Sequence, residues 1–306
     1  MTVGIDIGGT KTHIALRDAH GSVRENVIPS DSWRRGGLFG DPENAARLTD
    51  AIRELSTGEE SGALVIGAHG CDTPEHCERL SRQMQSAYGR SVTVVNDAQL
   101  LVPAAGHAAG LAVIVGTGSI VVGSSPGDPM IVAGGHGWLF GDPGSAPGIV
   151  RESVKLLLQR RDQVAGDDEL GRRLTEFFDV DDVTGLIYAL SVAPEIGLWG
   201  SAAPVVFEAA DHGSAAAIDI IDAAARELAD DVLNVFRRGA VGTAIVCAGG
   251  VVTNQPRLFS ALTKHIADVS PDSSVELLRA PPVTGALALA DAADAAAQRQ
   301  GRASPA

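Results

Sequence analysis

Residues 3–16 read Val3-Gly-Ile-Asp-Ile-Gly-Gly-Thr-Lys-Thr-His-Ile-Ala-Leu16, an apolar stretch interrupted by a Gly-Gly turn. Apolar residues on both sides of the turn, several of them β-branched, predict two strands joined as a hairpin. About 110 residues further on, Ala112-Val-Ile-Val-Gly-Thr-Gly-Ser-Ile-Val-Val-Gly123 repeats the order of strand, Gly/Thr turn and strand. The sequence therefore predicts one domain type used twice.

Predicted strands and helices are interleaved along the rest of the chain. Short β-branched runs bounded by Gly or Asp predict buried strands, and apolar residues at helical spacing predict amphipathic helices. The expected strands are 3–7, 63–66, 92–95, 111–115, 120–122 and 244–247, and the expected helices are 45–55, 218–236, 253–264 and 284–299. This order indicates an α/β fold, with the small-residue segment 103–109 as the domain boundary.

Length and composition limit the class of protein. A chain of 306 residues is long enough for two domains. A net charge of -14 and a pI near 4.9 argue against nucleic acid and anionic membranes as partners, because both attract basic surfaces. Three cysteines are too few for a secreted disulfide framework, and no apolar run approaches the ~18 residues of a membrane span. We therefore expect a cytoplasmic protein.

The segment Asp6-Ile-Gly-Gly-Thr-Lys-Thr12 has the chemistry of a phosphate-binding turn. Its glycines let backbone N–H groups approach a phosphate closely, and its hydroxyls and Lys11 can donate to phosphate oxygens. An ordinary β-hairpin explains the Gly-Gly pair equally well. The spacing matches neither the P-loop nor the dinucleotide-binding fingerprint. Gly116-Thr-Gly-Ser119 repeats the turn without a cation, and Ala248-Gly-Gly-Val251 is a third glycine turn after a predicted strand.

Two carboxylates follow a strand or lie among glycines. Asp97 ends the stretch Val94-Val-Asn-Asp97, at the edge where open α/β sheets bind ligands, and could accept a proton from an attacking hydroxyl. A helix N-cap is the competing interpretation of Asp97. Asp142 lies in the glycine-rich stretch 133–145, whose His, Trp and Phe residues favour a binding loop over a structural turn. Asp142 is suited to bind sugar hydroxyls.

Five motifs, in order, resemble those of the acetate and sugar kinase, heat-shock chaperone and actin superfamily: 6–12, 96–98, 116–119, 134–145 and 248–251. The chain is most similar to the N-acetylglucosamine kinase branch of the BadF/BadG/BcrA/BcrD ATPase family, which also contains activators of 2-hydroxyacyl-CoA dehydratases. The resemblance implies two ribonuclease-H-like (actin-like ATPase) domains flanking a nucleotide cleft that holds ATP and Mg²⁺, and a homodimer. The implied domains are 1–107 and 108–283, and the segment 284–306 is a helix returning to the first domain plus a frayed tail.

The matching positions receive roles from this resemblance. Asp6 would hold Mg²⁺ through water, and Asp97 would be the general base for the sugar hydroxyl. The phosphates of ATP would lie against Gly8, Gly9, Thr10, Lys11, Thr12, Gly116, Thr117, Gly118 and Ser119. The adenosine pocket would include Gly213, Ala248, Gly249 and Gly250. The sugar would contact Asp31, Trp33, Asn96, Asp97, Gly135, His136 and Asp142.

The expected sugar site departs from the family pattern on two sides. Relatives usually have an Asn in the segment that reads Ser30-Asp-Ser-Trp-Arg-Arg-Gly-Gly37 here, and commonly have Trp and Glu in place of His136 and Pro143. The competing interpretation of Arg34 and Arg35 in this segment is a solvated charged loop without a ligand. The residues considered for this altered site are Trp33 or Trp138 for stacking on a pyranose, Asp31 or Asp142 for hydroxyls, and Arg34 or Arg35 for an acidic substituent.

The sequence predicts an ATP-dependent kinase acting on an amino sugar such as N-acetylglucosamine, glucosamine or a related hexose derivative. An ATPase that activates a partner dehydratase is the alternative enzyme, but Cys71 and Cys77 lack the spacing expected for its cluster ligands. A non-catalytic sugar or nucleotide sensor is the third candidate. The run His69-Gly-Cys-Asp-Thr-Pro-Glu-His-Cys77 matches no usual zinc spacing, so we do not expect a structural metal there.

Overall fold

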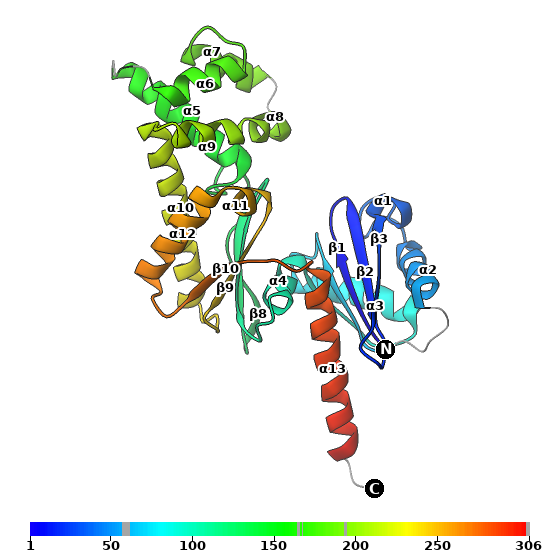
Figure 1. The fold of residues 1–306 in the computed structure, drawn as a ribbon. Helices are drawn as coiled ribbons and strands as arrows, with labels where there is room; N and C mark the ends of the chain where they lie inside the picture. The colour runs from blue at the N-terminus through cyan, green and yellow to red at the C-terminus, as the bar shows by residue number, and fades with distance from the viewer. Residues whose placement is uncertain (57–61, 164–165, 167, 193–194, 304–306) are drawn as a thin grey trace. The chain divides into compact units, whose positions relative to one another are not determined.

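The chain folds into two compact units, each built on a five-stranded mixed sheet (Figure 1). The computed structural model describes residues 1–306 except 57–61, 164–165, 167, 193–194 and 304–306. Unit 1 contains Met1–Ala108 and Leu278–Ala306, and unit 2 contains Ala109–Leu277. The domain limits predicted from the resemblance, 107/108 and 283/284, differ from these divisions by one and six residues.

The sheet of unit 1 has the order β3-β2-β1-β4-β5, in which β1–β3 form an antiparallel meander and β4 and β5 extend it in parallel. The strands are β1 (Thr2–Ile7), β2 (Lys11–Arg17), β3 (Val23–Pro29), β4 (Leu64–Ala68) and β5 (Val92–Asn96). The helices are α1 (Ser30–Trp33), α2 (Asn44–Ser56), α3 (Pro74–Tyr88), the 3₁₀ helix η1 (Asp97–Leu100), α4 (Leu101–Ala104) and α13 (Val283–Ala303).

Both faces of the unit 1 sheet are covered, which explains why its central strands β1 and β4 are mostly apolar. Side chains alternate along β1, so Ile5 and Ile7 enter the core formed with α2 and α3. On the opposite face α13 packs against β1, β4 and α4. Gly4 makes this close packing possible, since a Cβ there would lie 2.6 Å from the backbone nitrogen of Leu287.

Unit 2 repeats the same order, β8-β7-β6-β9-β10, with β6–β8 antiparallel and β9 and β10 added in parallel. The strands are β6 (Gly110–Val115), β7 (Ser119–Ser125), β8 (Asp128–Gly134), β9 (Ala244–Ala248) and β10 (Ser274–Leu277). The helices are α5 (Ala146–Asp162), α6 (Glu169–Phe177), α7 (Val183–Val192), α8 (Ile196–Ser201), α9 (Ala203–Asp211), α10 (Ala215–Arg237), α11 (Gly250–Asn254) and α12 (Pro256–Val269).

The α/β class and the duplicated sheet are confirmed, and every predicted strand is present. The helices predicted at 45–55, 218–236 and 284–299 lie within α2, α10 and α13. The single helix predicted at 253–264 is wrong: α11 ends at Asn254 and α12 begins at Pro256, whose missing N–H and ring interrupt a continuous helix. No strand was predicted at β3, β8 or β10, which are edge strands that bury few side chains.

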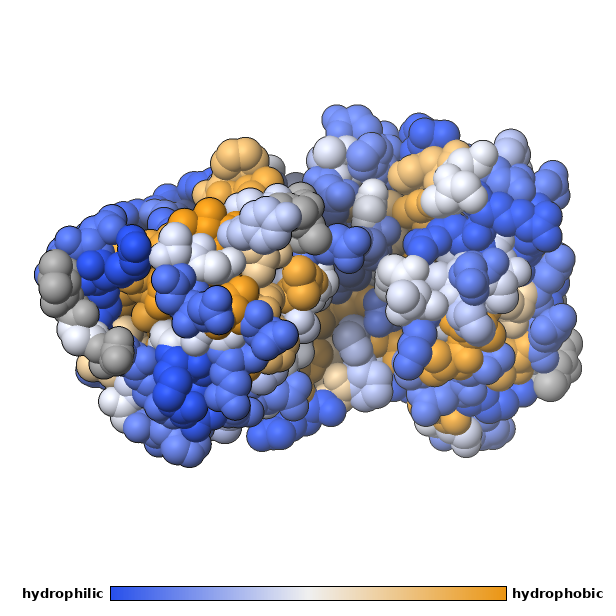
Figure 2. Space-filling model, turned by 90° about the horizontal axis from the view of Figure 1, so that it is seen from above, coloured by the Kyte–Doolittle hydropathy of each residue, from blue (hydrophilic) through white to orange (hydrophobic). Residues whose placement is uncertain are grey.

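The surface of unit 2 carries apolar patches among its polar residues (Figure 2). Along the helices α6 to α8 the exposed large apolar side chains are those of Phe177, Ile187 and Ile196, together with the aromatic ring of Tyr188. Within the described residues, none of the helices is both long and apolar enough to cross a membrane.

Candidate active site

Three parallel strands of unit 1 end at one edge of its sheet. Ile7 of β1 lies opposite Ala68 of β4, and Ala68 lies opposite Asn96 of β5. The residues that follow these strand ends, among them His69 and Asp97, therefore lie on the same edge. Because open α/β sheets bind ligands at the carboxyl ends of their strands, this edge is the candidate active site of unit 1.

Asn96, and not Asp97, is the N-cap of the helix that follows. Asp97 Oδ1 accepts a hydrogen bond from the Ala98 N–H at 3.1 Å, and among the described residues its Oδ2 has no hydrogen bond. Asn96 Oδ1 accepts a hydrogen bond from the Ala98 N–H at 3.0 Å, within a capping box. The Asp97 side chain is 32% exposed. Burial raises the pKa of the Asp97 carboxyl; His69 opposes that shift and Asp72 adds to it. The N-cap interpretation of Asp97 is therefore wrong, and a carboxyl of raised pKa suits a general base.

Asp6, near the end of β1, is a half-buried carboxylate without a partner. Burial raises its pKa to about 6, the charge of Asp97 adds to the rise, and His13 opposes it. Within the described residues its carboxylate takes part in no hydrogen bond or ion pair. Mg²⁺ in phosphoryl-transfer sites is held by one or two carboxylates and by substrate phosphates. The lone carboxylate fits the Mg²⁺ role predicted for Asp6, which stays a prediction.

The β1–β2 turn presents backbone and side-chain donors at the same edge. The Gly8 N–H donates to the Lys11 carbonyl at 2.9 Å and closes the turn. Gly9, Thr10 and Lys11 are exposed, as phosphate contacts require. Arg34 Nη2 donates to the Gly9 carbonyl at 2.6 Å. The turn therefore has a second cation beside it, one that the sequence analysis assigned to a sugar substituent or a solvated loop.

Thr12 and Trp33 do not have the roles predicted for them. The Thr12 hydroxyl is fully buried, lies 2.9 Å from Ser30 Oγ and accepts a hydrogen bond from Trp33 Nε1 at 2.9 Å. Trp33 itself is 3% exposed. The predicted phosphate contact of the Thr12 side chain and the predicted stacking of Trp33 on a sugar are wrong. Side chains alternate along β2, so Lys11 points to solvent and Thr12 to the core.

Asn96 is likewise committed to the protein. Its side chain is 6% exposed, and Nδ2 donates to the Cys71 carbonyl at 3.2 Å and to Asp72 Oδ1 at 3.1 Å. Oδ1 caps the next helix, so the Asn96 amide is hydrogen-bonded within the protein on both its atoms, and the sugar contact predicted for it stays a prediction. Asp31 is exposed on α1, and its sugar contact stays a prediction.

In unit 2 the β6–β7 turn repeats the glycine chemistry without a charge. The Gly116 N–H donates to the Gly118 carbonyl at 2.8 Å, and Thr117 between them is exposed. Ser119 is 3% exposed, and its Oγ has no hydrogen-bond partner. Buried hydroxyls without a partner are rare, so this group needs an explanation. The phosphate contacts predicted for this turn stay predictions.

Asp142 braces the glycine-rich loop that follows β8. Its backbone adopts a φ of 56°, its side chain is 5% exposed, and Oδ1 accepts a hydrogen bond from the Gly137 N–H at 3.1 Å. A Cβ on Gly118 would lie 3.1 Å from Asp142 Oδ2, so the carboxylate also supports the β6–β7 turn. Gly135 and His136 are exposed beside it. Sugar contacts of Asp142, Gly135 and His136 stay predictions.

The same loop exposes apolar and aromatic side chains. Phe140 is 87% exposed and Leu139 is 60% exposed. Trp138 packs on Trp199 with ring centroids 5.0 Å apart, which gives it a partner within the protein. In the sequence, Trp138 and Phe140 lie between two glycines, and this pair was the signal for the exposed ring of Phe140.

The glycines predicted for adenosine lie in two turns of unit 2. Gly249 has a φ of 106°, and a Cβ there would lie 2.4 Å from the Val115 carbonyl oxygen, so the packing of β6 against this turn requires glycine. Gly250 faces open space, and Ala248 ends β9. Gly213, with a φ of 87°, makes the turn between α9 and α10. Their adenosine contacts stay predictions.

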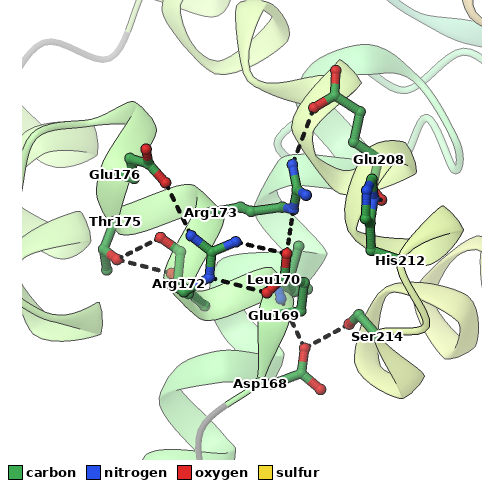
Figure 3. A network of polar contacts seen from close by, with 11 residues as sticks. Asp168, Glu169, Leu170, Arg172, Arg173, Thr175, Glu176, Glu208, His212 and Ser214 are labelled. Carbon is green, nitrogen blue, oxygen red and sulfur yellow. Dashed lines mark hydrogen bonds and ion pairs between the residues drawn. The ribbon is translucent and has the colours of Figure 1, made fainter.

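A polar network fixes the turn that contains Gly213 (Figure 3). Ser214 caps α10 and donates from Oγ to Asp168 Oδ1 at 2.5 Å, while Asp168 caps α6. Hydrogen bonds from Arg172 and Arg173 lower the pKa of Glu169 to about 2. Arg173 also reaches Glu208 of α9 at 3.4 Å. The network ties α6 to the helices on both sides of the turn.

Comparison with known proteins assigns this fold to a family. The model of the BadF/BadG/BcrA/BcrD ATPase family matches residues 3–290. The chain belongs to the BadF/BadG/BcrA/BcrD ATPase family. The N-acetylmuramic acid/N-acetylglucosamine kinase of Clostridium acetobutylicum is 28% identical over 86% of this chain and 89% of its own. The N-acetyl-D-glucosamine kinase of Dictyostelium discoideum is 25% identical over 94% of this chain and 97% of its own.

Solved structures support the fold of this family member. A ROK family glucokinase from Streptomyces griseus, in complex with glucose and AMPPNP, superposes with a TM-score of 0.52. It is 18% identical, over 95% of this chain and 99% of its own. This likeness shows the actin-like ATPase fold and does not identify the substrate.

The cysteines of this family member have no metal arrangement around them. Among the described residues no group of three or more His, Cys, Asp or Glu side chains is placed to hold a metal ion. Cys71 is buried, and burial together with Cys77 raises the pKa of its thiol to about 12. A thiol of that kind is a poor cluster ligand, because metals bind the thiolate.

Proposed function

We propose that this chain is an ATP-dependent kinase that transfers the γ-phosphoryl group of ATP to a hydroxyl of an amino sugar. Asp97 carries the proposal: it is a partly exposed carboxylate of raised pKa, placed at the strand ends of unit 1 beside the β1–β2 turn. Both curated relatives are named as kinases of N-acetylated amino sugars, which supports an acceptor of the same class.

The roles of the residues follow from general acid–base chemistry. Asp97 accepts the hydroxyl proton as the sugar oxygen attacks the γ-phosphorus. The exposed donors of the turn, Gly9, Thr10 and Lys11, stabilise negative charge that grows on the phosphoryl oxygens. Asp6 would hold Mg²⁺ when the ion is bound, and the ion would supply further neutralisation of the phosphates.

An assay of ADP release tests this function. Purified protein with ATP and Mg²⁺ is offered N-acetylglucosamine, glucosamine, N-acetylmuramate, N-acetylmannosamine and glucose, and the phosphorylated sugar is identified by mass spectrometry. We expect at least one amino sugar to release ADP in step with product. The Asp97→Asn protein is the matched control, because it keeps the shape of the side chain and loses the base. Release of ADP that is independent of every sugar would instead favour a partner-activating ATPase.

A homodimer is part of the same proposal. The exposed Phe177, Ile187 and Ile196 of unit 2 support it, since apolar side chains gathered along neighbouring helices are typical of association surfaces. Sedimentation equilibrium of the full chain measures the assembly directly.

A further inference from the structure

The end of β4 carries an ionisable side chain to which the proposed kinase function assigns no role. His69 is the first residue after β4, and its backbone N–H donates to the Ile7 carbonyl at 2.8 Å. Because Ala68 lies opposite Asn96, the next residues of the two strands, His69 and Asp97, lie side by side. Nδ1 of His69 is 3.6 Å from Oδ2 of Asp97.

The backbone on both sides of His69 is fixed. The bond to Ile7 holds its N-terminal side, and Asn96 Nδ2 holds the Cys71 carbonyl two residues later. Gly70 between them has a φ of 89°, a left-handed turn that glycine adopts without strain. The same Asn96 that caps the helix after Asp97 therefore also holds the turn that carries His69.

The surroundings of Asp97 are otherwise acidic. Asp72 on the following loop and Asp6 on β1 are the nearby carboxylates, and His13 of β2 acts on Asp6. Among the described residues, only His69 brings a basic side-chain nitrogen within 4 Å of the Asp97 carboxylate. The His69 side chain is 66% exposed, whereas that of Asp97 is 32% exposed. The imidazole thus lies between a partly buried carboxylate and solvent.

We propose that His69 takes the proton that Asp97 receives from the sugar hydroxyl and passes it to solvent. This inference rests on the proposed kinase function. The hydroxyl O–H bond breaks as its oxygen bonds to the γ-phosphorus, and the bond from that phosphorus to the bridging oxygen breaks, its electron pair leaving with ADP. The hydroxyl proton goes to Asp97 Oδ2 and then to Nδ1 of neutral His69. The imidazolium then gives one proton to water, which restores both side chains.

The distance and the exposure fit this role. A separation of 3.6 Å is longer than a hydrogen bond, and such contacts in a site without substrate shorten when the substrate binds. His69 acts through Asp97 and touches no reacting atom, so it is a positioning residue with a relay function. Without it Asp97 must lose its proton directly to water, in an acidic environment that favours the protonated carboxyl.

His69→Ala and His69→Asn test the relay, with His20→Ala as control, because His20 is an exposed residue of the β2–β3 turn in the same unit. We expect both His69 variants to slow phosphoryl transfer about tenfold in multiple-turnover measurements with chemistry rate-limiting, while KM for ATP and sugar stays the same. Imidazole added to the buffer should restore His69→Ala, since it enters the space left by the ring and accepts the proton. The control should keep the rate of the unaltered protein.

Two results would overturn the relay. One is an unchanged rate in both His69 variants; the other is a loss that imidazole does not restore, which would mean a structural role only. A readout without substrate separates this inference from the kinase proposal: carboxyl ¹³C NMR titration should give Asp97 a higher pKa in His69→Asn than in the unaltered protein. Equal titration in the two proteins would contradict the pairing, whether or not any sugar is phosphorylated.

Discussion

The first hairpins of the two sheets have the same architecture and different chemistry. In unit 1 Ile7 ends β1 and pairs with Thr12, and in unit 2 Val115 ends β6 and pairs with Ser119. Thr12 and Ser119 thus hold matching positions, both with buried hydroxyls. The Thr12 hydroxyl has two partners within the protein, whereas the Ser119 hydroxyl has none. One hydroxyl is bonded within the core, and the other is buried without a hydrogen-bond partner among the described residues.

The contrast extends along the strand ends. The residue before Ile7 is Asp6, and the residue before Val115 is Ile114. The turn of unit 1 contains Lys11, whereas the turn of unit 2 contains only Gly116-Thr-Gly118. The first hairpin of unit 1 therefore carries ionisable side chains, whereas that of unit 2 carries only backbone donors and hydroxyls. A duplicated fold can divide its chemistry in this way because topology fixes where strand ends lie and leaves the side chains there free to differ.

The largest expected effect is the difference in kcat between a substitution of Asp97 in unit 1 and one of Asp142 in unit 2. Asp97→Asn should lower kcat by about 10²- to 10⁴-fold, because an amide cannot accept the hydroxyl proton. Asp142→Asn should leave kcat within a few-fold (~3), since an amide oxygen still accepts the Gly137 N–H and Asn tolerates a positive φ. Steady-state kinetics of both variants measure the difference. A large rise in sugar KM for Asp142→Asn would show that its carboxylate binds the sugar. It would also show that ionisable groups of the site are not confined to unit 1.

The next effect concerns the charge at the end of β1. Asp6 has a folded-state pKa of about 6 against an ordinary value of 3.8, so the folded protein binds this proton more tightly than the unfolded chain. Stability from this group is therefore present below the ordinary pKa and is lost as pH rises through the folded one. Asp6→Asn should be more stable than the unaltered protein by about 1–3 kcal/mol at neutral pH and show no gain near pH 4.

Urea unfolding of the two proteins across that pH range measures this difference. If Asp6 has the proposed Mg²⁺ role, added Mg²⁺ with ATP should stabilise the unaltered protein more than Asp6→Asn. A stability difference that is the same at acid and neutral pH would contradict the raised pKa.

The smallest expected effect comes from the two matching hydroxyls. Thr12→Val leaves the buried indole N–H of Trp33 without an acceptor and should cost about 1–3 kcal/mol of unfolding free energy. Ser119→Ala removes a hydroxyl that has no partner and should change stability by less than about 0.5 kcal/mol. KM for ATP should rise in Ser119→Ala and stay the same in Thr12→Val. The reverse pattern of KM values would exchange the roles given to the two hairpins.

The candidate site was predictable from the sequence to different degrees. Asp6 and Asp97 were found because each lies within two residues of the end of a strongly apolar run, where the chain must reach a sheet edge, and Lys11 because it follows a Gly-Gly turn. Thr12, Trp33 and Asn96 were assigned to ligands and proved to bond to one another or to neighbouring backbone. Nothing in a linear pattern shows that a hydroxyl at 12 and an indole at 33 are hydrogen-bonded across two strands.

The sequence by itself determined the α/β class, the duplicated hairpin and the positions of the glycine turns, because hydrophobic periodicity and glycine are local signals. It also carried enough similarity to identify the ATPase family. Only the tertiary structure decided which polar side chains are hydrogen-bonded within the protein and which have groups left to bind a ligand. The pairing of His69 with Asp97 depends on the parallel register of β4 with β5, and a register joins residues far apart in the chain.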